Sequence, residues 1–132
     1  MVVRQIRSHR RSAFTLMEMM AVVAIIVMLA GMGTWGYMRY LESARENKAK
    51  MDITHIGQAV EQYKNDTGNY PDNLQVLTMP MDNKPAFLEA KDLIDPWNQP
   101  YVYEPQNLNP ATFRPRIHSN HPGPGGQPIS NW

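Results

Sequence analysis

The chain has 132 residues, no cysteine, and 13 Lys and Arg against 12 Asp and Glu, which gives a formal net charge of +1. The absence of cysteine excludes a disulfide framework, so a small exported domain must be held together by packing, a metal or assembly. Removing the first 13 residues takes away four arginines and leaves nine basic residues. The remainder is mildly acidic and lacks the basic face that nucleic acids require, so no nucleic-acid partner is expected.

The segment at 1–13 is basic, and the segment at 14–38 is apolar apart from Glu18. About 20 apolar residues cross a hydrocarbon core about 30 Å thick, so the second segment is long enough to span a membrane. A cleaved secretory signal peptide is the rival interpretation, but its apolar core would be only about 7 to 15 residues long. Arginines ahead of the span predict a cytoplasmic N-terminus and an exported remainder. They are Arg4, Arg7, Arg10 and Arg11.

The segment at 39–65 continues the pattern as an amphipathic helix. Its apolar residues recur at spacings of 4, 3, 4 and 3, which is typical of one stripe along a helix. They are Ala49, Ile53, Ile56, Val60 and Tyr63. We therefore expect one helix from about Phe14 to about Asn65, roughly 75 Å long, with its stripe packed against the rest of the exported part. A coiled-coil seam is the alternative.

Three glycines lie close together in the apolar segment, at Gly31, Gly33 and Gly36. Each weakens a helix by about 1 kcal/mol relative to Ala, and each also lets a neighbouring helix approach closely. The sequence predicts either a soft stretch of helix or a helix contact here, and does not distinguish between them.

The residues at 66–132 form a different kind of segment, because all 11 prolines lie between Pro71 and Pro128. Such a composition predicts a small domain with little helix. Gly68 suits the left-handed conformation that ends a helix, and Pro71 prevents its resumption. The long helix is therefore expected to end just before this domain.

Local patterns within this domain predict a short helix and two strands. Asp72 is a candidate cap for the short helix that follows it. Alternation predicts strands at 100–104 and 112–118, and Pro115 places the second at a sheet edge because proline has no N–H to donate. Asn98 is expected in the turn before the first strand, where it tolerates a positive φ.

The residues Phe14, Thr15, Leu16 and Glu18, which follow a basic leader and open an apolar helix, resemble the signature of the type IV pilin-like proteins. The resemblance implies that a prepilin peptidase removes the leader by cutting between Ala13 and Phe14, and then methylates the new amino group of Phe14. Ala13 stands where the family usually has Gly.

The resemblance also implies a role for Glu18. A charge in the middle of a bilayer costs roughly 2.5 to 3.5 kcal/mol, so this carboxylate requires compensation. In the family it is proposed to pair with the free amino terminus of a neighbouring subunit's Phe14, which would set the register of a filament. The alternative is that Glu18 reaches the lipid headgroups near the cytoplasmic end of the span.

Two segments of the C-terminal domain, Tyr70-Pro71 and Asp95-Pro96-Trp97, resemble the major pseudopilins of type II secretion, a family within the pilin-like proteins. The resemblance implies that these residues pack the head. Trp97 is expected to anchor a small sheet to the long helix, and stacking on a ligand is the alternative role for it.

The segment from Ser119 to Trp132 stands where that family has an Asp-rich loop that binds calcium. Calcium takes about six to eight oxygen ligands, several of them from carboxylates, and this segment contains no Asp or Glu. The sequence therefore predicts no cofactor and disfavours calcium. His118 and His121 are three residues apart but lack a third ligand, so no metal site is assigned.

The resemblance implies an α+β fold: a pilin-like lollipop with a long N-terminal helix and a small C-terminal head that carries a short antiparallel β-sheet. It implies a structural subunit of a periplasmic pseudopilus that drives protein export by type II secretion. The expected location is the bacterial inner membrane, crossed once, with the head in the periplasm. Expected partners are copies of the chain itself, the prepilin peptidase, minor pseudopilins, the inner-membrane secretion platform and membrane lipid.

Two other functions remain open from the sequence. One is a type IV pilin for adhesion, motility or DNA uptake, which would carry a larger head and generally a disulfide. The other is a single-span anchored domain that never polymerises and does not depend on Glu18. An enzyme is not expected, because the sequence contains neither a nucleophile elbow nor a phosphate-binding glycine loop.

Overall fold

The computed structural model describes residues 14–81 and 84–132, and the chain divides into two compact units, Met1–Arg39 and Tyr40–Trp132. Each unit is described by itself. The basic leader and Ala13 lie outside the described residues.

One α-helix, α1 (Leu16–Thr67), contributes to both units. It begins after Thr15 and ends at Gly68, which has φ +85° and donates its N–H to the carbonyl of Lys64 at 2.7 Å. A residue without a Cβ adopts this left-handed conformation at no steric cost, and so satisfies one of the last helical carbonyls. The prediction of one continuous helix that ends near Gly68 is confirmed.

In the first unit, the described chain is almost entirely helix. This part of α1 is long and apolar enough to cross a membrane, and its most apolar window contains no buried residue. Large apolar side chains such as Leu16, Met17 and Met32 are 75 to 79% exposed. A helix that is apolar on all sides is stable only inside a membrane or among other helices.

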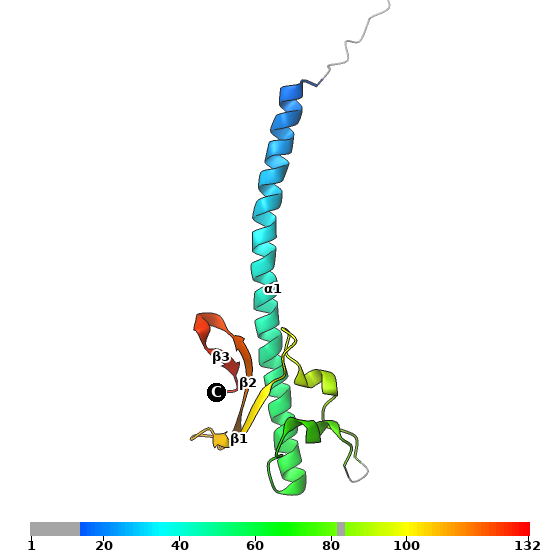
Figure 1. The fold of residues 1–132 in the computed structure, drawn as a ribbon, viewed down its shortest axis with the longest axis vertical. Helices are drawn as coiled ribbons and strands as arrows, with labels where there is room; N and C mark the ends of the chain where they lie inside the picture. Colours follow the sequence, from blue (N-terminus) through cyan, green and yellow to red (C-terminus); the bar gives the residue numbers. More distant parts are fainter. Residues whose placement is uncertain (1–13, 82–83) are drawn as a thin grey trace, which may run out of the picture. The chain divides into compact units, whose positions relative to one another are not determined.

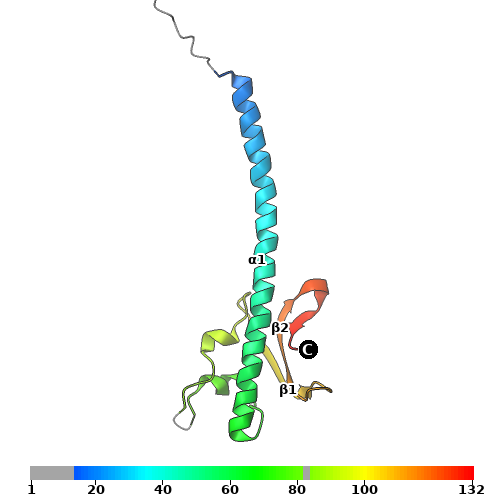
Figure 2. The same ribbon diagram turned by 180° about the vertical axis from the view of Figure 1, so that it is seen from behind.

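In the second unit, a hydrophobic core forms where the sheet and the loop segments pack on α1. The helix contributes the predicted stripe, in which Ala49, Ile53, Ile56 and Val60 are buried and Tyr63 packs at the edge. The loop segments include two 3-10 helices, η1 (Leu74–Thr78) and η2 (Ala90–Leu93). Figures 1 and 2 show the sheet on one flank of this part of α1 and these loop segments on the other. The remaining core residues are Ala59, Leu74, Leu77, Leu88, Tyr101, Ile117 and Ile129.

The sheet has three antiparallel strands in the order β1-β2-β3: β1 (Val102–Leu108), β2 (Pro115–Pro122) and β3 (Pro128–Ser130). A short 3-10 turn, η3 (Pro124–Gly126), joins the last two. The two predicted strands exist but lie two to four residues later than expected, and β3 was not predicted. Three residues are too few to show alternation, so the sequence carried no signal for β3.

Two local predictions in this unit are wrong. Pro115 does not place its strand at an edge, because β2 is the central strand and Pro115 is its first residue, where no ladder hydrogen bond from its nitrogen is needed. The short helix η1 is capped by Asn73 rather than Asp72: the Asn73 side chain accepts the N–H of Val76 at 3.2 Å. The positive φ predicted at Asn98 is confirmed at 65°.

Candidate functional site

The start of α1 carries a reciprocal pair of hydrogen bonds between Thr15 and Glu18. The N–H of Thr15 donates to Glu18 Oε2 at 2.9 Å, and the N–H of Glu18 donates to Thr15 Oγ1 at 3.2 Å. This is a capping box, which satisfies two of the free donors at a helix N-terminus. Within one chain, the Glu18 side chain is therefore held at the first residue of this box, directly after Phe14, which is 79% exposed and precedes the helix.

The glycines of the apolar segment lie on an open helix surface. A Cβ added at Gly31, Gly33 or Gly36 would meet no atom within 4 Å apart from the nearby helix backbone. None of them interrupts α1. The space around them is compatible with close approach of a second helix, and the softness predicted for this stretch stays a prediction.

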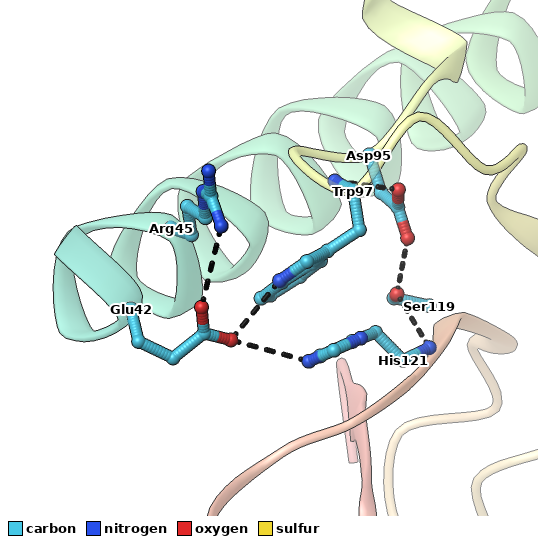
Figure 3. A network of polar contacts seen from close by, with 6 residues as sticks. All are labelled: Glu42, Arg45, Asp95, Trp97, Ser119 and His121. Carbon is cyan, nitrogen blue, oxygen red and sulfur yellow. Dashed lines mark hydrogen bonds and ion pairs between the residues drawn. The ribbon is translucent and has the colours of Figure 1, made fainter. Parts of the chain in front are cut away.

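In the second unit, two side chains from distant parts of the sequence meet at the carboxylate of Glu42. Glu42, on α1, accepts the indole N–H of Trp97 at its Oε1 at 3.0 Å, and the Nε2 of His121 lies 3.2 Å from the same oxygen. Because an ionised carboxylate only accepts, His121 donates from Nε2. Arg45 lies 3.5 Å from the other oxygen, Oε2. Figure 3 shows this arrangement, and we call Glu42, Trp97 and His121 the latch.

The two rings of the latch also stack on each other. The ring centroids of Trp97 and His121 are 3.8 Å apart, and the ring planes are inclined by 10°. Both rings direct an N–H to Glu42, so the stack and the shared acceptor restrain the same two side chains. One face of Trp97 is thereby occupied by His121, so that face is not free to stack on a ligand.

Behind the latch, Asp95 organises the turn that carries Trp97. Its Oδ1 accepts the N–H of Trp97 at 3.0 Å and that of Gln99 at 2.8 Å, while its Oδ2 accepts the hydroxyl of Ser119 at 2.5 Å. Asp95 is 4% exposed and Ser119 is fully buried. Ser119 Oγ accepts the N–H of His121 at 3.0 Å. A buried carboxylate thus has its hydrogen bonds satisfied and joins the turn to β2.

The other predicted head residues lie elsewhere in the second unit. Pro71 is buried, and Pro96 is half-buried beside the latch residue Trp97. Tyr70 donates its hydroxyl to the carbonyl of Phe113 at 3.1 Å, which connects the end of α1 to the turn between β1 and β2. The structure therefore distributes the five predicted residues over two regions of the head.

Sequence reasoning missed Glu42 and Ser119 altogether. Glu42 is 55 residues from Trp97 and 79 from His121, so no local spacing connects them. His121 was considered only as a metal ligand, and within residues 14–81 and 84–132 no group of three His, Cys, Asp or Glu is placed to hold a metal ion. A lone carboxylate at a helical position gives no signal of its partners.

Comparison with known proteins identifies the family. Residues 36–124 match the family described as "Type II secretion system (T2SS), protein G", and residues 8–34 match the "Prokaryotic N-terminal methylation motif". The chain belongs to the protein G family of the type II secretion system. The first match covers the second half of α1 and most of the residues that follow it, so the membership does not depend on the N-terminal motif alone.

Several protein G relatives extend over most of the chain. It is 32% identical to the type II secretion system core protein G of Aeromonas hydrophila over 117 residues, which are 81% of this chain and 79% of that one. The Pseudomonas aeruginosa protein of the same name is 35% identical, over 81% and 80%. The Pectobacterium carotovorum protein is 32% identical, over 94% and 86%. Among solved structures, none matches the chain significantly.

Proposed function

We propose that this protein is a structural subunit of a pseudopilus, the filament of the type II secretion system. The observation that carries the proposal is the pair of neighbouring family matches, with the methylation motif at residues 8–34 and protein G at residues 36–124. The fold agrees with this role, because a long helix and a small antiparallel sheet are the parts of a pilin-like subunit. The protein G family is a family of structural subunits rather than enzymes.

The N-terminal motif supports processing by a prepilin peptidase. The proposed cut separates Ala13 from Phe14, and the new amino group of Phe14 is then methylated. Phe14 lies immediately before the capping box of Thr15 and Glu18. Processing would therefore create a free amino terminus four residues ahead of a carboxylate that is already oriented toward the start of the helix.

The proposed driving force for assembly is burial of the apolar part of α1 between copies of the chain. Many of its large side chains are more than half exposed in the single chain. In the stored state this surface faces lipid, so assembly gains van der Waals packing between helices rather than removal of apolar area from water. The proposed role of Glu18 is to pair with the amino terminus of Phe14 in a neighbouring copy, which sets the stagger between subunits.

The proposed location is the inner membrane before assembly and the periplasm for the filament. The basic residues ahead of the span favour a cytoplasmic N-terminus by the positive-inside rule. The prepilin peptidase, minor pseudopilins and the inner-membrane secretion platform are the proposed partners, together with other copies of the chain.

Intact mass and N-terminal fragmentation of the protein from its native membrane test the proposal. We expect a chain that begins at N-methylated Phe14. A chain that still begins at Met1 would indicate a permanently anchored domain, and a cut beyond Gly31 would indicate an ordinary exported protein.

Assembly is tested by Glu18→Ala in cells that carry the secretion system. We expect the variant to insert in the membrane but to form no filament, as judged by crosslinking between copies and electron microscopy of sheared filaments. Thr34→Val, which changes another polar residue of the same helix, is the matched control and should still assemble. Filaments formed by Glu18→Ala at the wild-type level would contradict the proposed role of Glu18.

A further inference from the structure

The C-terminal segment from Ser119 to Trp132 is attached to the rest of the second unit by side chains at both of its ends. Near its start, Ser119 bonds to Asp95 and His121 joins the latch. Near its end, Asn131 accepts the N–H of Ile117 at 2.9 Å and donates to the carbonyl of Pro115 at 2.9 Å. Ile129, between them, is 5% exposed in the core.

The turn between these ends is closed by its own backbone. The N–H of Gly123 donates to the carbonyl of Gln127 at 2.8 Å, and the N–H of Gly126 donates to the carbonyl of Gly123 at 3.0 Å. Gly125 and Gly126 have φ of 79° and 77°, which the turn requires and which glycine adopts without strain. The turn is therefore closed without a carboxylate.

The oxygen atoms available in this region do not provide a suitable set of ligands for calcium. The segment itself contains no Asp or Glu. The two carboxylates that contact it are already used: Asp95 accepts three hydrogen bonds, and Glu42 accepts from Trp97 and His121. Calcium needs about six to eight oxygens, with carboxylates among them, and ring nitrogens such as that of His121 are poor ligands for it.

We propose that the latch of Glu42, Trp97 and His121 holds the C-terminal segment on α1 in place of a calcium ion, so that this head folds without any divalent cation. The carboxylate of Glu42 replaces a bound calcium ion as the charged centre. Two segments, the Asp95 turn and β2, are both bound to it. Hydrogen bonds to a charged acceptor are stronger than those between neutral groups. The ring stack adds contact that a spherical ion does not supply.

The first test is thermal unfolding of the full chain in detergent micelles, in EGTA and in millimolar calcium chloride. We expect the same Tm in both, because no site gains or loses an ion. Amide hydrogen exchange of Ile117 and Ile129 should likewise be equally slow in both conditions. A Tm that rises by several degrees with calcium, or exchange that slows with it, would overturn the proposal. These measurements need no filament, so their outcome is independent of the proposed function.

The second test separates the two parts of the latch. Glu42→Gln removes the charge, and His121→Ala removes one ring and one donor; we expect each to lower Tm by about 5 °C, a typical shift for a domain of this size. His121→Phe keeps a ring for the stack without the N–H, and should restore part of the loss.

The matched controls lie on the same helix. Glu46→Gln changes a carboxylate one turn from Glu42, and His55→Ala changes an exposed histidine. Both should leave Tm within about 1 °C of the wild-type value, because neither side chain belongs to the latch. Latch variants that behave like these controls would overturn the proposal. A calcium chloride titration that restores the Tm of Glu42→Gln would also overturn it.

Discussion

Tyr101 donates its hydroxyl to Asp52 Oδ2 at 3.1 Å, which connects the residue before β1 to the middle of α1. Asp52 also accepts Lys48 Nζ at 2.6 Å through the same oxygen. Tyr101 is 6% exposed in the core. A buried phenol that meets a carboxylate must stay protonated, so this contact between helix and head has a defined dependence on pH.

Burial, and then the charge and hydrogen bond of Asp52, raise the pKa of Tyr101 well above its ordinary value of 10.0. The folded state therefore keeps a proton that the unfolded state loses, and the stability from this group is present below pH 10 and is lost as pH rises above it. We expect Tyr101→Phe to remove part of the fall in Tm between pH 9 and pH 11. An unchanged fall in the variant would contradict this, and the exposed Tyr40→Phe is the control.

Whereas Tyr101 makes the stability depend on pH in the alkaline range, His118 does so in the acid range. Burial lowers the pKa of His118 below the ordinary 6.5. The charge of Glu104 raises this pKa in part, and the charge of Arg116 lowers it slightly further. The unfolded state then binds a proton more readily, so stability is present above about pH 6.5 and is lost as pH falls through the lower folded pKa. We expect His118→Gln to flatten the dependence of Tm on pH between 6.5 and 4.5. The exposed His55→Gln should keep the wild-type slope.

The helix stripe should account for much of the stability of the second unit. Ile56 is fully buried, and truncating a buried isoleucine to alanine costs about 2 to 5 kcal/mol from lost contacts and the cavity left behind. We expect Ile56→Ala to lower the urea midpoint strongly, as followed by tryptophan fluorescence. Met51→Ala, at a position on the same helix that is 72% exposed, should have little effect. Equal midpoints for the two variants would show that the stripe does not pack as described.

Alanine substitutions at two glycines of the second unit should change its stability in opposite directions. A Cβ at Gly123 would lie 2.7 Å from Ile129 Cγ1 and 3.1 Å from the carbonyl of Gln127, so Gly123→Ala is expected to lower Tm. At Gly57, inside α1, the nearest atom within reach is Ile117 Cδ1 at 4.0 Å. Gly57→Ala should raise stability by roughly 0.5 to 1 kcal/mol, because alanine favours the helix. Thermal unfolding measures both, and a stabilising Gly123→Ala would contradict the close approach.

The three glycines of the apolar segment are tested together. Replacing Gly31, Gly33 and Gly36 by alanine should leave the helix content in micelles unchanged or higher, because each alanine favours helix by about 1 kcal/mol. We expect fewer filaments in cells, whether the glycines act through softness or through close packing. Wild-type filament yield from the triple variant would show that neither property is needed.

Sequence patterns were sufficient to predict the long helix α1. The apolar run at 14–38 is long and the stripe from Ala49 to Tyr63 is periodic, so local pattern was enough to predict α1. The turn at Asn98 and the helix end at Gly68 were predictable for a similar reason, since a positive φ selects few residue types.

The register of the sheet, the existence of β3 and the latch follow from packing between distant segments. The first two depend on pairing between strands rather than on the strands themselves, as Pro115 in the central strand shows. Trp97 and His121 reach Glu42, across separations of 55 and 79 residues, only because the Asp95 turn and β2 both pack on α1. A carboxylate on a helix has many potential partners, and its partner is selected by the packing of the whole domain.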